Sequence, residues 1–153
     1  MKAILLCAIA LGAVSTAQAQ VRVIDPWVRS TVGGQTVAGA FMKLESPVAE
    51  ILVGASSPAA ARVELHRTIM EGTVAKMRPV DRIVLAPGKT VELKPGGYHI
   101  MLVDIVKPLA KGDTVPLRLE FERLGKPKET VDVKAVVKDV MAPMSSQMHM
   151  DMK

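Results

Sequence analysis

The sequence predicts an all-β protein, an antiparallel β-sandwich or small barrel with Greek-key connections. Short runs that alternate apolar and polar residues recur along the chain behind residue 19. Between them stand turn residues, such as Gly33-Gly34 and Pro95-Gly96-Gly97, that favour tight reversals of the backbone. No long window carries a convincing helical period. A chain of 153 residues is long enough for one domain with a hydrophobic core.

Each expected strand is bounded by Gly, Pro, Asp or Ser residues. The clearest runs from Thr114 to Glu122, where apolar and polar residues alternate strictly, so that one face is buried. Pro116 lies in this run and should stand at an edge or near the strand start, because proline cannot donate to a strand ladder. The expected strands cover residues 22–24, 28–30, 37–45, 49–53, 61–67, 74–78, 82–85, 90–94, 98–104, 114–122 and 129–138.

The first nineteen residues have the composition of a secretory signal peptide. Lys2 precedes an apolar run over residues 3–14, and cleavage is predicted between Ala19 and Gln20. The run is too short to cross a bilayer as a permanent helix, so no stable membrane insertion is expected and the protein should be exported. Cys7 lies inside the run directly after two leucines, so lipid attachment there is not expected. The mature protein then has no cysteine, which excludes disulfides, thiolate metal sites and cysteine nucleophiles.

The chain is mildly basic, with a formal charge of +5 that falls to +4 once Lys2 is removed with the signal. Its lysines and arginines are scattered, as on solvated strand faces, and export argues against a nucleic-acid partner. A weak preference for acidic protein partners is the remaining interpretation of the charge. A monomer is expected.

We expect the domain to cover residues 20–138 and a flexible tail to cover residues 139–153. The tail has no strand period but is rich in methionine and histidine, a composition that suggests metal affinity rather than a plain solubilising end. Its candidate ligands for a second metal are Met141, Met144, Met148, His149, Met150 and Met152.

Inside the domain, two of the three histidines lie in one pattern with two methionines: His66, Met77, His99 and Met101. Strand alternation places His99 and Met101 on the same side. By the same argument His66 lies opposite Leu65, so it should be presented outward rather than buried. The pattern does not orient Met77.

A set of two imidazoles and two thioethers selects soft copper, Cu(I), over hard cations. Structural zinc sites normally contain cysteines, and blue-copper electron transfer needs a thiolate, so neither use is expected of this set. A single methionine in a strand is usually core filler, so we expect Met42 and Met70 to be packed in the core. Chemistry alone leaves open whether the four central residues form a site, because gaps of ten and twenty-one residues mean nothing without a fold.

The spacing His-x10-Met-x21-His-x-Met resembles the signature of the periplasmic copper chaperone family called PCuAC, whose members have a cupredoxin-like β-sandwich. The similarity extends from about Trp27 to about Val137. The segments that carry it are Pro26-Trp27-Val28-Arg29, Gly54-Ala55-Ser56-Ser57-Pro58, Val63-Glu64-Leu65-His66, Met77-Arg78-Pro79-Val80, Leu93-Lys94-Pro95-Gly96-Gly97-Tyr98-His99-Ile100-Met101 and Gly112-Asp113-Thr114-Val115-Pro116-Leu117.

This resemblance implies that the four central residues bind Cu(I) and that the protein carries copper in the periplasm. It implies delivery toward cytochrome c oxidase assembly, with a Sco-type chaperone or an oxidase subunit as the acceptor. The tail resembles extensions found in some members of the family, and a second copper, Cu(II), is expected there through His149.

Three other functions remain open. Copper buffering or resistance would use the same site without delivery. A metal-free β-sandwich interaction module would make the histidines and methionines incidental. A copper oxidase would need an open coordination position and a substrate pocket, and no catalytic set is recognisable among the acidic residues, so we expect no enzyme activity.

Overall fold

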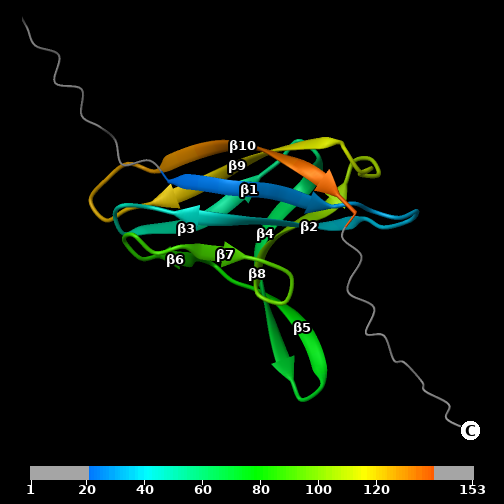
Figure 1. Ribbon diagram of the computed structural model, residues 1–153, viewed down its shortest axis with the longest axis horizontal. Coiled ribbons are helices and arrows are strands. Elements are labelled where there is room, and N and C mark those ends of the chain that lie inside the picture. The colour runs from blue at the N-terminus through cyan, green and yellow to red at the C-terminus, as the bar shows by residue number, and fades with distance from the viewer. Residues whose placement is uncertain (1–20, 140–153) are drawn as a thin grey trace, which may run out of the picture.

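The structure is a computed structural model that describes residues 21–139, and this part of the chain consists of ten β-strands without a helix (Figure 1). No stretch of these residues therefore forms a helix able to span a bilayer. The strands are β1 (Arg22–Arg29), β2 (Val37–Glu45), β3 (Glu50–Ser56), β4 (Ala60–Glu71), β5 (Val74–Pro79), β6 (Ile83–Leu85), β7 (Val91–Leu93), β8 (Tyr98–Ile105), β9 (Thr114–Glu122) and β10 (Glu129–Lys138).

The strands follow the order β5-β4-β8-β2-β1-β10-β9-β3-β6, and β7 pairs with β2 beside this path. Every described pair is antiparallel except β1 with β10, which is parallel. The sheet folds over on itself, so that β3 and β4 contact each other although they are distant in the strand order (Figure 1). The predicted all-β sandwich is confirmed.

The core lies between the two layers and is filled mainly by valine, leucine and isoleucine. In β9 the predicted alternation is observed, since Val115, Leu117, Leu119 and Phe121 are all at most 2% exposed. Pro116 is the third residue of this strand and lies beyond the last described pair of β3 with β9. It thus stands near the strand start.

The first strand differs from the prediction. The sequence suggested two short strands on either side of Asp25-Pro26, whereas β1 is continuous from Arg22 to Arg29. Its pairing with β2 shifts register between Ile24 and Trp27, and Asp25 has a φ of 47°. A β-bulge therefore absorbs the break that proline would otherwise impose.

The two methionines expected in the core have different environments. Met42 is 2% exposed and is core filler, as predicted. Met70 is 64% exposed, so its prediction is wrong. The reason is the length of β4, which continues to Glu71 and forms with β5 a hairpin that projects from the body of the domain (Figure 1).

One carboxyl group is buried at the edge of the core. Glu50 is 1% exposed, and its Oε1 lies 3.5 Å from Nη1 of Arg123. Neither carboxylate oxygen has a hydrogen-bond partner among the described residues. Burial raises the pKa of Glu50, and Arg123 only partly offsets this effect.

We therefore predict that Glu50→Gln stabilises the protein at neutral pH by about 1 kcal/mol. The raised pKa of Glu50 in the folded state means that the contribution of this one carboxyl group to stability is fully present below its unfolded pKa and is lost as pH rises through the folded pKa. Urea unfolding at pH 5 and pH 7.5 should show the advantage of the variant growing with pH. A less stable variant at pH 7.5 would mean that the ion pair with Arg123 outweighs the cost of burial.

Candidate metal centre

The two histidines of the predicted site are direct partners across two neighbouring strands. In the antiparallel pair of β4 with β8, His66 lies opposite His99 and Glu64 lies opposite Met101. Partners in such a pair project from the same face of the sheet. The imidazole rings are accordingly close, with centroids 5.7 Å apart, and Met101 shares their face. Two residues 33 positions apart in the chain are thus neighbours.

The register also orients Met77, which the sequence pattern could not. Met77 lies opposite Thr68 in the pair of β4 with β5. Because Thr68 and His66 are two residues apart in one strand, they project from the same face, and so does Met77. All four predicted ligands therefore belong to one face of the sheet. Met77 is 58% exposed, whereas the two histidines lie closer to the body of the domain.

His99 is enclosed, although it lies on the side opposite the main core. It is 2% exposed, and the ring of Phe41 lies 6.2 Å from its own. Its Nδ1 lies 3.1 Å from the carbonyl oxygen of Gly97. A carbonyl only accepts hydrogen bonds, so Nδ1 carries the proton and Nε2 keeps a lone pair. That Nε2 is buried and finds no partner among the described residues.

Burial also favours the neutral form of this ring. The pKa of His99 is lowered chiefly by desolvation and further by the neighbouring charge of His66, while the hydrogen bond to Gly97 acts in the opposite direction. A neutral imidazole is the form that can ligate a metal. The environment of His99 therefore maintains a free nitrogen lone pair.

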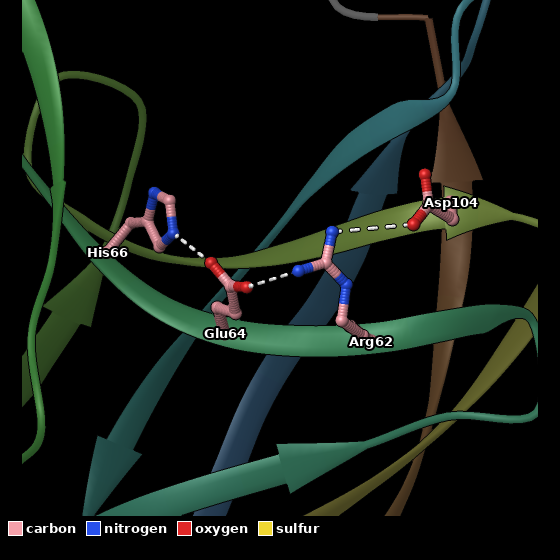
Figure 2. Close-up of polar contacts among 4 residues, drawn as sticks. All are labelled: Arg62, Glu64, His66 and Asp104. Atoms are coloured by element: carbon pink, nitrogen blue, oxygen red, sulfur yellow. Dashed lines mark hydrogen bonds and ion pairs between the residues drawn. The ribbon is translucent and has the colours of Figure 1, made fainter.

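His66 is hydrogen-bonded through the other ring nitrogen, Nε2. Its Nε2 lies 2.8 Å from Oε2 of Glu64, whose pKa is lowered mainly by this hydrogen bond (Figure 2). Since the carboxylate accepts, Nε2 donates and Nδ1 retains its lone pair. The Nδ1 atom is buried and likewise unpaired within residues 21–139. As predicted, His66 lies on the side opposite Leu65 and outside the core, and its side chain is partly covered, at 14% exposed.

Glu64 is itself held by Arg62, which in turn contacts Asp104. Nη1 of Arg62 lies 3.7 Å from Oε1 of Glu64, and Nη2 of the same arginine lies 3.4 Å from Oδ2 of Asp104 (Figure 2). These contacts position the carboxylate that orients His66. The sequence analysis did not single out Glu64. The spacing of two residues between Glu64 and His66 in one strand was the available signal, because it places both side chains on one face.

The donors present fit a soft monovalent metal. Two imidazole nitrogens have free lone pairs, and two thioethers share their face. Within the described range, no three side chains of His, Cys, Asp or Glu come together in a way that could hold a metal ion. Thioether with imidazole is the donor combination that suits Cu(I).

The remaining predicted residues lie outside the described part of the chain. They are the signal peptide with Cys7 and the candidate ligands of the tail, Met141, Met144, Met148, His149, Met150 and Met152. Their assignments stay predictions.

Comparison with known proteins identifies the family. Residues 21–137 match the family described as "Putative lipoprotein LpqE-like". The chain belongs to this LpqE-like family. Its relatives include the "Putative lipoprotein Lxx21020" of Leifsonia xyli subsp. xyli, which is 34% identical over 102 residues, 66% of this chain and 61% of the relative. The "Uncharacterized protein RP573" of Rickettsia prowazekii is 34% identical over 112 residues, 69% of this chain and 62% of the relative. The LpqE-like chain described here spans about three fifths of the length of these relatives.

Solved structures show that this LpqE-like protein has the fold of PCuAC domains. The copper-bound PCuAC domain from PmoF2 is 28% identical, with a TM-score of 0.61 over 78% of this chain and 93% of that domain. Apo-DR1885 from Deinococcus radiodurans is 29% identical, with a TM-score of 0.59 over 92% of this chain and 95% of that one. The CuI-DR1885 structure is 30% identical, with a TM-score of 0.60 over 82% and 83% of the two chains. The cupredoxin-like fold is thus shared with copper-binding domains.

The hydrogen bonds of the two histidines predict opposite tautomers in the metal-free protein. His99 should carry its proton on Nδ1 and His66 on Nε2, because each proton is donated to a fixed oxygen. Long-range ¹H–¹⁵N correlation spectra at pH 7.5 would assign both rings. In the control variant Glu64→Leu, His66 should exchange between tautomers while the pattern of His99 stays unchanged. A proton on Nε2 of His99 in the natural protein would contradict this geometry.

Proposed function

We propose that this LpqE-like protein is a periplasmic copper chaperone that binds Cu(I) and passes it to an acceptor protein. The proposed ligands are Nδ1 of His66, Nε2 of His99 and the sulfur atoms of Met77 and Met101. The observation that carries the proposal is the pair of neighbouring imidazoles, each with one nitrogen hydrogen-bonded and the other buried and without a partner among the described residues. Similarity to a copper-bound PCuAC domain and to CuI-DR1885 supports it.

The four donors are neutral, which suits a carried ion. Thioether and imidazole bind Cu(I) without cancelling its charge, so an acceptor with anionic or additional soft donors can compete for it. The unequal exposure of the ligands also favours transfer: His99 is buried, whereas Met77 is 58% exposed at the base of the projecting hairpin. An acceptor can therefore reach one ligand before the others.

The same exposure favours delivery over buffering, the second candidate function. A protein that only stored copper would gain from enclosing every ligand, and Met77 is not enclosed. The proposed acceptors are a Sco-type chaperone or the copper-binding subunit of cytochrome c oxidase. Incubation of the Cu(I)-loaded protein with each apo acceptor, followed by separation and metal analysis, distinguishes delivery from storage. Copper that stays on the donor in both mixtures would favour buffering.

The ligand assignment predicts that the double variant His66→Ala, Met101→Ala loses Cu(I) affinity by more than about 100-fold, since it removes one nitrogen and one sulfur donor. Competition against a chromogenic Cu(I) chelator under anaerobic conditions measures the affinity. Val84→Ala on β6 is the control, because Val84 is 61% exposed and lies on a strand at the other end of the sheet. Unchanged affinity in a folded double variant would remove the basis of the proposal.

A second copper is proposed for the tail, with His149 as a Cu(II) ligand. Deletion of residues 141–153 should then lower the copper stoichiometry while leaving the Cu(I) affinity of the domain within about twofold, as expected for independent sites. Metal analysis of the loaded proteins, with X-ray absorption to count sulfur and nitrogen ligands, measures both quantities. Equal stoichiometry with and without the tail would rule out the second site.

A further inference from the structure

The hairpin of β4 with β5 forms an arm, residues 68–77, that extends beyond the body of the domain (Figure 1). Two backbone hydrogen bonds fix its base. The amide of Thr68 donates to the carbonyl of Gly97 at 3.0 Å, and the amide of Val80 donates to the carbonyl of Leu65 at 2.8 Å. All of β5 is exposed, and β5 stands at one end of the strand order. The side chains of the arm are therefore not needed for the core.

The two faces of the arm differ in chemistry. On the face of His66, the register pairs Thr68 with Met77 and Met70 with Ala75, and none of these four side chains is charged. The opposite face carries Glu71 together with Lys76 and Arg78, which form ion pairs with it. One face thus carries charged side chains joined in ion pairs, whereas the other is neutral and carries two thioethers.

Met70 and Met77 are exposed to similar extents, 64% and 58%. A methionine this exposed contributes little to stability through burial of apolar surface, unlike Met42, which fills the core. The position of the two thioethers on the arm, near His66, suggests a role in metal binding. Successive residues on one face of a strand are about 6.6 Å apart, so Met70 lies about 13 Å along β4 from His66.

Met77 lies between these two residues. Its partner Thr68 is two positions from His66 and two positions from Met70, so Met77 is a diagonal neighbour of both. Diagonal neighbours on one face are within reach of each other when the side chains are long, as methionine is. Met77 can consequently share a metal ion with Met70 toward the tip of the arm or with His66 toward its base.

We propose that Met70 is a handover ligand, which binds Cu(I) together with Met77 on the arm before the ion moves to the histidines and again as it leaves. The proposal rests on the proposed function, since it adds a step to the same site. On entry, the bond from Cu(I) to the sulfur of Met70 breaks as a bond to Nδ1 of His66 forms, while Met77 stays bound. The oxidation state does not change. No proton has to leave His66, because its proton is on Nε2 and is donated to Glu64.

The charge distribution supports a metal ion as the occupant of this face. A monovalent cation approaching Met70 meets no lysine or arginine among residues 68–77 on the same side, since Lys76 projects from the other. A thioether also binds Cu(I) without a proton to displace, which suits rapid exchange. The face therefore offers a short row of soft donors from the tip of the arm to the two imidazoles.

The test measures the rate of Cu(I) transfer and the equilibrium affinity for Cu(I) separately. Met70→Leu keeps the size and apolar character of the side chain and removes its sulfur. Transfer of Cu(I) from the loaded full-length protein to an excess of chromogenic chelator should slow about tenfold, whereas the equilibrium affinity should change less than about twofold, because the final site does not contain Met70. Anaerobic stopped-flow absorbance gives the rate, and chelator competition gives the affinity.

The control moves the sulfur to the other face. Val74 pairs with Glu71, so its side chain lies on the charged side of the arm. The double variant Met70→Leu, Val74→Met has the same number of thioethers as the natural protein but should transfer copper as slowly as Met70→Leu. Recovery of the natural rate would show that any methionine near the tip suffices and would overturn the positional argument.

A direct readout is the methyl signal of each methionine in protein labelled with ¹³C at the methionine methyl groups. Substoichiometric Cu(I) should shift the Met70 signal together with that of Met77, and full loading should return Met70 toward its metal-free position. A Met70 signal that never moves, with an unchanged transfer rate in Met70→Leu, refutes the handover role. If His66→Ala, Met101→Ala also leaves the affinity unchanged, the proposed function fails as well, so the two failures are distinguishable.

Discussion

The pairing of β4 with β8 is the constraint on which the site depends. It places His66 opposite His99 and Glu64 opposite Met101. A slip of one residue would move every side chain of one strand to the other face and separate the two imidazoles. The core prevents this slip, because Leu65, Ile100 and Leu102 project from the other face and are at most 4% exposed. Apolar packing on one side of the sheet thus fixes the chemistry on the other.

The arrangement of the two imidazoles has a cost in stability. A buried nitrogen without a hydrogen-bond partner loses its solvation, at about 1–3 kcal/mol for each such group. Both imidazoles contain one such nitrogen in the described structure. The surrounding structure nevertheless holds them in place, through Gly97 at one ring and through the chain of Glu64, Arg62 and Asp104 at the other. Aromatic packing adds to this support, since Phe41 lies beside His99 and stacks on Trp27 with centroids 4.5 Å apart. Such preorganisation is characteristic of a site that binds a ligand.

Exposure rises along the face that carries the ligands. His99 is almost completely buried, His66 is partly covered, and Met77 and Met70 on the arm are open to solvent. The unpaired nitrogen atoms are therefore buried, while the two thioethers of the arm lie where another protein can approach. This gradient connects the proposed carrier function with the proposed handover ligand.

The sequence by itself determined the all-β fold, most of the strands and the common face of His99 with Met101, because these follow from a two-residue period that local residues encode. It did not determine the continuity of β1, which depends on a bulge at Asp25, nor the length of the hairpin. The remaining features of the site depend on the register between strands that are distant in the sequence. The pairing of β4 with β5 and β8 oriented Met77, took Met70 out of the core and brought Glu64 into contact with His66 beside His99. Such pairings join residues far apart in the chain, and only the packing of the whole sheet selects among them.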